Sequence, residues 1–355
     1  MKYTMNKRKT YLDWLRVVAI VLVIYNHLPA HALSRETGLF GFVFPAVLVK
    51  IGVPLFLMIS GSLLLGRDEQ TKVLLGTRVL RMVVIIPVAY IGLYLVRSLH
   101  ETVLHGAAFE FSLKDCIYGL FSRNLVTKDS GPYWYLYAYL GYLLMLPFLR
   151  GAAKLMRRSH FILLIAIHAG IYTVLPLINA VLNCCGLDSI RITESFSVPL
   201  AVEQILFYPL AGYWLDRSST VDSMCHKKQF AILFAALAGA VTSALLYGRL
   251  GEKAALELTE WSSAITLFLF VKWMFFGKQA EVTKLSVRIC GLSGLVFGIY
   301  LLDPYLKLVL FGAYYTVGSR LPEPVCSLLW IPISISVGGF ITWILKKIPG
   351  VKRFL

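Results

Sequence analysis

The stretch YLDWLRVVAIVLVIYNHLPA, residues 11–30, decides how this chain is built. It is apolar enough to cross a membrane, yet it contains Arg16 and His27. Eleven positions at about 100° each make roughly three helical turns, so both side chains share one face, about 16 Å apart along the axis. A charge inside hydrocarbon costs roughly 2.5–3.5 kcal/mol or more unless it faces protein or water. The pair therefore predicts a functional polar stripe on the first helix.

The rest of the chain repeats this apolar pattern. Of its 355 residues, 58% are hydrophobic and 15% are charged, against roughly 25% charged in soluble domains. The excess forms stretches of about 18–25 residues, each long enough to cross ~30 Å of hydrocarbon. Ten spans are predicted, near residues 11–30, 40–65, 79–99, 132–149, 161–181, 198–215, 229–248, 258–276, 289–311 and 326–345. We expect an all-α integral membrane protein, one domain over residues 1–355, built as a single bundle of about ten transmembrane helices.

The basic residues predict the orientation of this bundle. With the N-terminus inside, 22 of the 35 Lys and Arg residues fall in inner segments and nine in outer segments. This asymmetry predicts that both termini are cytoplasmic. It also accounts for the net charge of +16 and argues against nucleic-acid binding, because the charge forms no patch. The first stretch is not expected to be a cleaved signal peptide, because it contains Asp13 and Arg16.

Other features of the chain carry less information. The six cysteines have no metal-type spacing, so no metal site is expected. The segment FSLKDCIYGLF, residues 111–121, has helical spacing and is predicted to lie at the membrane interface or to cap the bundle. The aromatic residues of 131–139, including Trp134, form either an interfacial belt alone or a belt that also shapes an acceptor site.

The predicted topology places three titratable groups at similar depth. His27, Glu203 and Asp303 all fall in the outer half of their spans. Acidic neighbours raise the basicity of a histidine and fix its tautomer, which suits it to act as a general base. A structural reading stays open for the two acids, since Glu203 has Arg191 or Lys50 as a candidate ion-pair partner and Asp303 has Lys307 one turn on. His168, alone on an apolar stretch, is expected to be structural.

A pair of arginines opens the third span from its cytoplasmic side. Arg78 and Arg81 lie at i and i+3 in TRVLRMVVIIP, residues 77–87. Guanidinium groups bind phosphate oxygens bidentately, so the pair is a candidate anion site. The alternative is that both residues only anchor the topology. With Arg16 at similar depth, we favour the anion site.

These segments resemble a known family, the membrane-bound acyltransferase-3 family of bacterial surface-glycan O-acyltransferases. The resemblance is carried by LDWLRVVAIVLVIYNH (12–27), GVPLFLMISGSLL (52–64), TRVLRMVVIIP (77–87), PYWYLYAYLGYLLMLP (132–147) and FGIYLLDPYL (297–306). The arginine, ten residues and histidine of the first segment match without alteration. Many members have a histidine beside the tryptophan, where this chain has Pro132 and Tyr133, and many have a histidine at the position of Asp303.

The resemblance implies an enzyme of the bacterial inner membrane. It would take an acyl group, most often acetyl, from cytoplasmic acyl-CoA and pass it to a sugar hydroxyl of a lipid-linked or cell-surface glycan. Acyl-CoA is then a donor substrate, and no permanently bound cofactor is expected. The partners implied are the lipid bilayer, acyl-CoA and the glycan acceptor, whose identity the sequence leaves open.

The resemblance and the residues together assign candidate roles. His27 is the predicted catalytic base, accompanied by Arg16 and Asp13. Asp13, Glu203 and Asp303 are each candidates to orient it. The predicted acyl-CoA-binding residues are Arg78, Arg81 and Ser60. Lys50 and Trp134 are further candidates on the acceptor side.

Two other classes of function compete with the enzyme. A secondary transporter is compatible with ten spans, buried charges and the proline at position 54, but no corresponding pair of broken helices is predicted in two halves of the chain. The other alternative is a non-catalytic membrane subunit or sensor. Acyl transfer from labelled acetyl-CoA distinguishes the enzyme from both.

Overall fold

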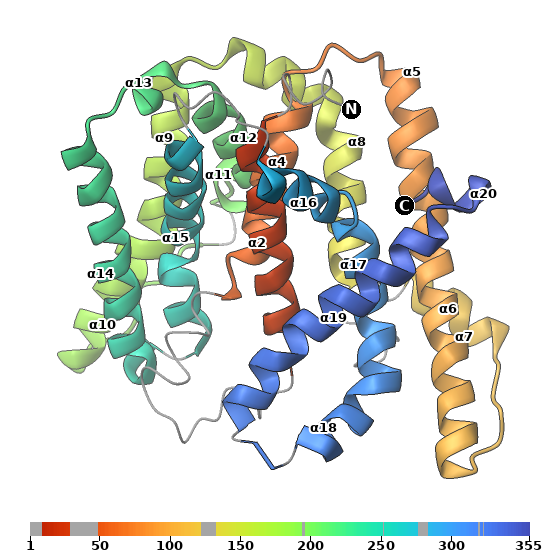
Figure 1. Ribbon diagram of the computed structural model, residues 1–355. Coiled ribbons are helices and arrows are strands. Elements are labelled where there is room, and N and C mark those ends of the chain that lie inside the picture. The colour runs from red at the N-terminus through yellow and green to blue at the C-terminus, as the bar shows by residue number, and fades with distance from the viewer. Residues whose placement is uncertain are drawn as a thin grey trace. The chain divides into compact units, whose positions relative to one another are not determined.

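The computed structural model describes residues 9–28, 49–121, 133–193, 196–250, 252–275, 283–318, 320–321 and 323–355. All regular elements in these residues are helices (Figure 1). The predicted spans 11–30, 40–65, 132–149 and 258–276 extend in part outside the described residues. The chain divides into unit one, residues 1–67 and 146–293, and unit two, residues 68–145 and 294–355. That both form one domain stays a prediction.

Unit one contains most of the helices. They are α2 (Thr10–Asn26), α4 (Gly52–Leu64), α9 (Arg158–Ala169), π-helical η7 (Gly170–Val174), α10 (Leu175–Cys184), α11 (Pro199–Val202), α12 (Gln204–Arg217), α13 (Ser219–Asp222), α14 (His226–Leu250), α15 (Glu252–Phe275) and α16 (Lys284–Ser293).

Unit two is smaller. Its helices are α5 (Thr71–Leu74), π-helical η4 (Leu75–Val79), α6 (Leu80–His105), α7 (Leu113–Phe121), α17 (Val296–Leu306), η8 (Lys307–Phe311), α18 (Gly312–Gly318), α19 (Glu323–Leu345) and α20 (Pro349–Lys352). Helix α8 (Trp134–Leu155) begins in unit two and ends in unit one. The helix predicted within residues 111–121 is confirmed as α7.

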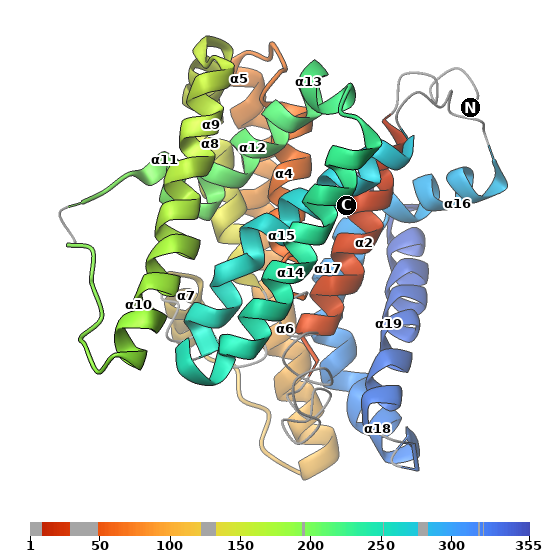
Figure 2. The ribbon, with the colours of Figure 1, turned by 90° about the vertical axis from the view of Figure 1, so that its left-hand side faces the viewer.

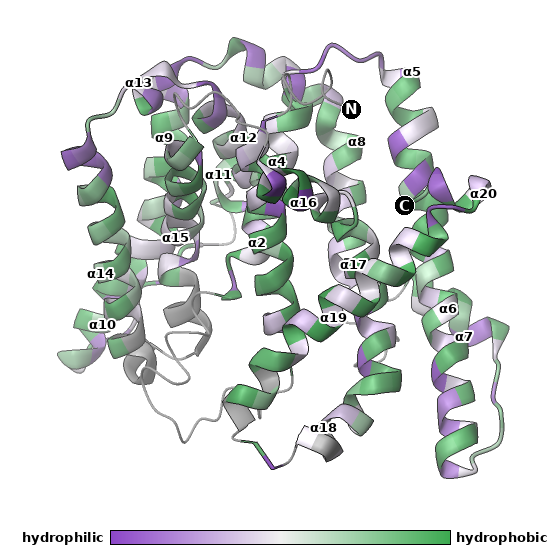
Figure 3. Cartoon of the chain, viewed as in Figure 1, coloured by the Kyte–Doolittle hydropathy of each residue, from purple (hydrophilic) through white to green (hydrophobic). Residues whose placement is uncertain are grey.

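The helices have the length and hydropathy of membrane spans. Five helical stretches of the described residues are long and apolar enough to cross a bilayer, namely Thr71–His105, Trp134–Leu155, Arg158–Cys184, Val296–Tyr314 and Leu328–Leu345. Figure 3 shows hydrophobic residues along the helices and hydrophilic residues in the connection before α5 and around α13. The chain is thus a multi-pass helical membrane protein, whereas ten spans and cytoplasmic termini stay predictions.

Close packing of α4 against α12 holds the centre of unit one, where α2 also packs against α4, α15 and α16 (Figure 2). A Cβ atom on Gly61 would lie 1.9 Å from the carbonyl oxygen of Pro209, and one on Gly212 would lie 2.2 Å from that of Met58. The Ser62 hydroxyl donates to the Gly212 carbonyl at 3.0 Å. Only glycine permits so close an approach of two backbones.

Two predicted spans are broken, which the sequence did not indicate. Span 198–215 is interrupted at Glu203, whose backbone is extended between α11 and α12. Span 289–311 is interrupted at residues 294–295, between α16 and α17. The sequence did not predict these two breaks, because average hydropathy over a window of about 20 residues is insensitive to a break of one or two residues.

Tyrosine hydroxyls tie the helices of unit two together. Tyr305 of α17 donates to the Ala89 carbonyl of α6 at 2.8 Å, beside Gly92, where a Cβ atom would lie 2.5 Å from the same hydroxyl. Tyr133, just before α8, donates to the Leu301 carbonyl at 2.7 Å. These bonds satisfy polar groups within an apolar unit, where an unpaired donor would be costly.

Candidate functional site

A buried carboxylate holds the arginine of the first helix. Oδ1 of Asp13 accepts a hydrogen bond from the Arg16 guanidinium at 3.0 Å and another from the Ser293 hydroxyl at 2.7 Å. Asp13 is 2% exposed, and the Arg16 side chain is 28% exposed. The Arg16 guanidinium also lies 3.4 Å from the Ser293 hydroxyl. Arg16 is therefore fixed by its own helix and by the end of α16.

His27 lies directly after the last residue of α2. Its backbone N–H donates to the carbonyls of Val23 and Ile24 at 3.0 and 3.1 Å, and the residue is half-buried. Since α2 is continuous, His27 lies about 16 Å from Arg16 and about 21 Å from Asp13 along the axis, at ~1.5 Å per residue. Asp13 therefore cannot orient the His27 imidazole, which removes one of the three predicted partners.

A second buried carboxylate fixes the start of α2. Asp216, near the end of α12, accepts hydrogen bonds from Lys9 at 2.6 and 2.7 Å and from the Tyr11 hydroxyl. Arg217 lies 3.3 Å from the same carboxylate. Both oxygens of the Asp216 carboxylate have partners in this cluster. We therefore interpret the cluster as a structural contact that holds the start of α2, the helix of Arg16, against α12.

The break at Glu203 is stabilised by side chains from neighbouring helices. His168 donates from Nδ1 to the Ala201 carbonyl at 2.5 Å, and the Tyr172 hydroxyl donates to the Val202 carbonyl at 3.1 Å. Both carbonyls belong to α11, which the break separates from α12. The His168 ring also stacks on Phe207 with centroids 3.7 Å apart. His168 thus has the structural surroundings expected for it.

Glu203 itself is exposed. Among the described residues neither Arg191 nor Lys50 forms an ion pair with it, so the structural reading of Glu203 gains no support. Sequence reasoning missed the nearby Glu260 of α15, which is 9% exposed and accepts from Gln204 at 3.2 Å and from Tyr208 at 3.4 Å.

Ser60 and Lys50, two further candidates of unit one, lie on or just before α4. Ser60 donates to the Phe56 carbonyl of its own helix at 2.9 Å, and Lys50 is exposed just before α4. Neither observation assigns them a role, so both remain predictions.

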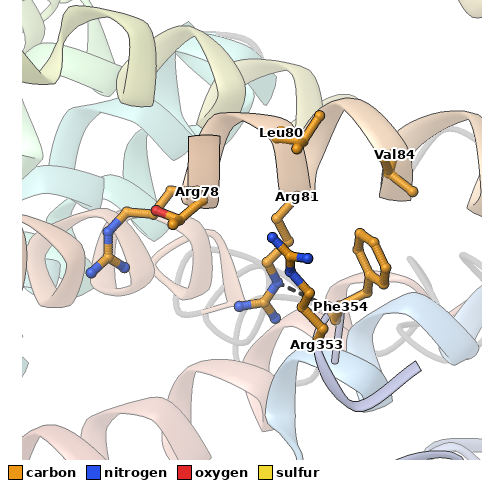
Figure 4. A pocket seen from close by; sticks show the side chains of 7 residues that line it. Arg78, Leu80, Arg81, Val84, Arg353 and Phe354 are labelled. Atoms are coloured by element: carbon orange, nitrogen blue, oxygen red, sulfur yellow. Dashed lines mark hydrogen bonds between the residues drawn. The ribbon is translucent and has the colours of Figure 1, made fainter. Parts of the chain in front are cut away.

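The paired arginines of unit two line a cavity of about 410 Å³. Its lining residues are Thr77, Arg78, Leu80, Arg81, Val84, Arg353 and Phe354. This volume falls within the roughly 300–1,000 Å³ of small-molecule sites. In Figure 4 the guanidinium groups of Arg81 and Arg353 lie between α6 and the C-terminal segment, and Arg78 points away from them.

Local contacts hold two of these arginines. Arg81 donates from Nε to the Phe354 carbonyl at 2.8 Å, and its guanidinium lies 4.9 Å from the centroid of the Phe297 ring. Nε of Arg78 lies 3.4 Å from a Glu69 carboxylate oxygen. Arg78 belongs to the π-helical turn η4, which changes its direction relative to Arg81 from that of a regular i, i+3 pair.

The remaining candidates of unit two lie on α8 and α17. Asp303 is 1% exposed and accepts from the Ser334 hydroxyl of α19 at 3.2 Å. Trp134, at the start of α8, is exposed. His27 and Glu203 belong to unit one and Asp303 to unit two, so the predicted convergence of all three stays a prediction.

Sequence reasoning also missed Ser293 and Arg353. Ser293 lies 280 positions from Asp13, and no spacing rule connects residues so far apart. Arg353 was counted only as one of the basic residues of an inner segment. Among the described residues no group of three or more His, Cys, Asp or Glu side chains is arranged to hold a metal.

The sequence of the chain matches a known protein family. A family model described as an acyltransferase domain, of the acyltransferase-3 type, matches residues 9–346. Neither the curated proteins nor the solved structures contain a match to the chain. The matched range includes the Asp13 and Arg16 cluster, His27 and the arginine pair of α6 and η4.

Proposed function

Because the chain belongs to the acyltransferase-3 family, we propose that it transfers an acyl group, acetyl in the first instance, from acyl-CoA to a sugar hydroxyl. The acceptor is a lipid-linked or cell-surface glycan, and the location is the bacterial inner membrane. One observation carries the choice of donor, namely the cavity lined by Arg78, Arg81 and Arg353.

The chemistry of this cavity suits the phosphate end of CoA. A CoA thioester carries a diphosphate and a ribose phosphate, and guanidinium groups pair with phosphate oxygens through parallel hydrogen bonds. Arg81 is held in place by the Phe354 carbonyl through Nε, which leaves its two terminal nitrogens for an anion. The apolar side chains of Leu80 and Val84 line the same cavity.

His27 is the proposed base for the transfer. Its imidazole removes the proton of the acceptor hydroxyl, the oxygen attacks the thioester carbonyl, and the carbon–sulfur bond breaks. The proton then passes from the imidazolium to the departing CoA thiolate. A positioned base of this kind accelerates a reaction roughly 10²–10⁴-fold. Arg16 is fixed by Asp13 and Ser293 and supplies a permanent positive charge on the same face of the first helix as His27.

Binding of acetyl-CoA to the purified protein tests the donor site. Arg78→Gln and Arg81→Gln are each expected to weaken the affinity about tenfold or more, because a lost charge-assisted hydrogen bond costs roughly 1.5–3 kcal/mol. Arg67→Gln is the matched control, because this exposed arginine follows the end of α4, donates from its side chain to the Leu63 carbonyl of that helix and does not line the cavity. His27→Ala is expected to bind normally. Equal affinities in all four variants would contradict the assignment.

A further inference from the structure

Arg353 differs from the other arginines of the cavity in its contacts. Arg81 is bonded to the Phe354 carbonyl, and Arg78 lies beside Glu69. For Arg353, no hydrogen bond or ion pair exists with any residue that the structure describes. Its side chain nevertheless extends into the cavity wall shared with Arg81 (Figure 4).

The surroundings of the cavity carry an excess of positive charge. Lys346 follows the end of α19 and donates to the Gly294 carbonyl at 2.5 Å. Burial lowers its pKa, and the nearby charge of Arg81 lowers it further. Like charges held close together disfavour one another unless an anion lies between them. The carboxylate of Glu69 is directed at Arg78. Within the part of the chain that the structure describes, no carboxylate forms an ion pair with Arg353.

Phe354 gives this end of the cavity an aromatic wall. Its backbone carbonyl is bonded to Arg81, and its half-buried side chain lines the cavity together with Val84. A nucleobase stacked on an aromatic ring gains roughly 1–3 kcal/mol. A nucleoside phosphate is recognised by a cation that pairs with its phosphate and by an aromatic ring that stacks on its base. Arg353 and Phe354 place these two groups on adjacent residues.

We propose that Arg353 and Phe354 form the subsite for the 3′-phosphoadenosine end of the acyl-CoA donor. Arg353 pairs with the ribose 3′-phosphate, Phe354 stacks against adenine, and Arg81, held through Nε by the Phe354 carbonyl, binds the diphosphate with its terminal nitrogens. The inference rests on the proposed function and adds a specificity, namely selection of CoA over dephospho-CoA, which lacks the 3′-phosphate.

Affinity measurements with these two probes test the subsite. The full chain, purified in detergent, is titrated with CoA and with dephospho-CoA. The wild-type protein is expected to bind CoA about tenfold more tightly, which corresponds to about 1.4 kcal/mol. Arg353→Gln is expected to lose this preference while its affinity for dephospho-CoA changes less than about twofold, since only the 3′-phosphate contact is removed.

Two further variants separate the parts of the proposal. Phe354→Leu retains the backbone carbonyl that Arg81 uses, and it is expected to weaken both probes about fivefold or more through lost stacking. Lys352→Gln is the matched control, because Lys352 is exposed and does not line the cavity. An unchanged melting temperature shows that each variant is folded.

The possible failures are distinguishable. If the wild-type protein binds both probes equally, or if Arg353→Gln weakens both to the same extent, the subsite is overturned while the proposed function stands. If the wild-type protein binds neither CoA nor dephospho-CoA, the proposed donor and the subsite fall together. Loss of CoA preference in Lys352→Gln would show that the effect is one of general charge and would also overturn the subsite.

Discussion

The hydrogen bond between Ser293 and Asp13 is the contact that most directly connects α16 to the helix of Arg16. We expect Ser293→Ala to destabilise unit one, because the bond is 2.7 Å long, both residues are buried and the acceptor is charged. Hydrogen bonds to charged groups contribute roughly 1.5–3 kcal/mol. The melting temperature of the purified protein should therefore fall by several degrees.

The stability that Ser293→Ala loses is expected to depend on the negative charge of Asp13. In Asp13→Asn the carboxylate that also holds Arg16 at 3.0 Å is removed, so this variant is expected to lose more stability than Ser293→Ala. Adding Ser293→Ala to Asp13→Asn should then cost less than it does alone, by at least about 0.5 kcal/mol, because the two residues are in direct contact.

Thermal melting in detergent of the two single variants and the double variant measures this coupling. Ser262→Ala is the control, since the Ser262 hydroxyl donates to the Thr259 carbonyl of its own helix and its removal should have little effect. Acyl transfer should fall in the same order as stability if the cluster positions Arg16. If Ser293→Ala costs the same stability in the wild-type protein and in Asp13→Asn, the hydrogen bond between Ser293 and Asp13 does not stabilise the protein.

Three shorter predictions concern packing. Gly61→Ala should destabilise the protein by about 1–3 kcal/mol through overpacking against α12. Gly151→Ala, with open space around the new methyl group, should be neutral or stabilising by up to about 1 kcal/mol. The melting temperatures of the two variants test this, and equal shifts would contradict the close packing of α4 against α12. Burial raises the pKa of the Cys116 thiol, so at pH 7.5 maleimide should label it far more slowly than the exposed Cys225, and equal rates would show that α7 is not docked as described. His168→Ala should lower stability by roughly 2–4 kcal/mol, because a buried ring and a hydrogen bond are both lost; an unchanged melting temperature would argue against its structural role.

The sequence predicted the helical segments well because hydropathy is a local signal. Each predicted span contains helix in the residues that the structure describes, and α7 was expected from its spacing. The breaks at Glu203 and at residues 294–295 were missed. Whether a helix is interrupted depends on tertiary partners such as His168 and Tyr172, which satisfy the carbonyls of α11 and are invisible in a hydropathy average.

The candidate site was predictable only where its residues are neighbours in sequence. Arg78 and Arg81 were recognised from their spacing, and Asp13 with Arg16 from sharing a helix. Ser293 and Arg353 join these groups from distant parts of the chain. Conversely, sequence reasoning allowed Asp13 as a partner of His27, whereas the rise of a continuous α2 separates them by about 21 Å.

The proposed reaction moves an acyl group from acyl-CoA to a glycan hydroxyl, with His27 as the base. The most direct test follows the reaction in liposomes with labelled acetyl-CoA and a lipid-linked oligosaccharide, and it measures released CoA thiol and labelled glycan together. We predict equal molar amounts of both with the wild-type protein and neither with His27→Ala, whose affinity for acetyl-CoA stays normal. Undiminished transfer by His27→Ala would show that His27 is not the base, and no thiol release by the wild-type protein would show that acyl-CoA is not the donor.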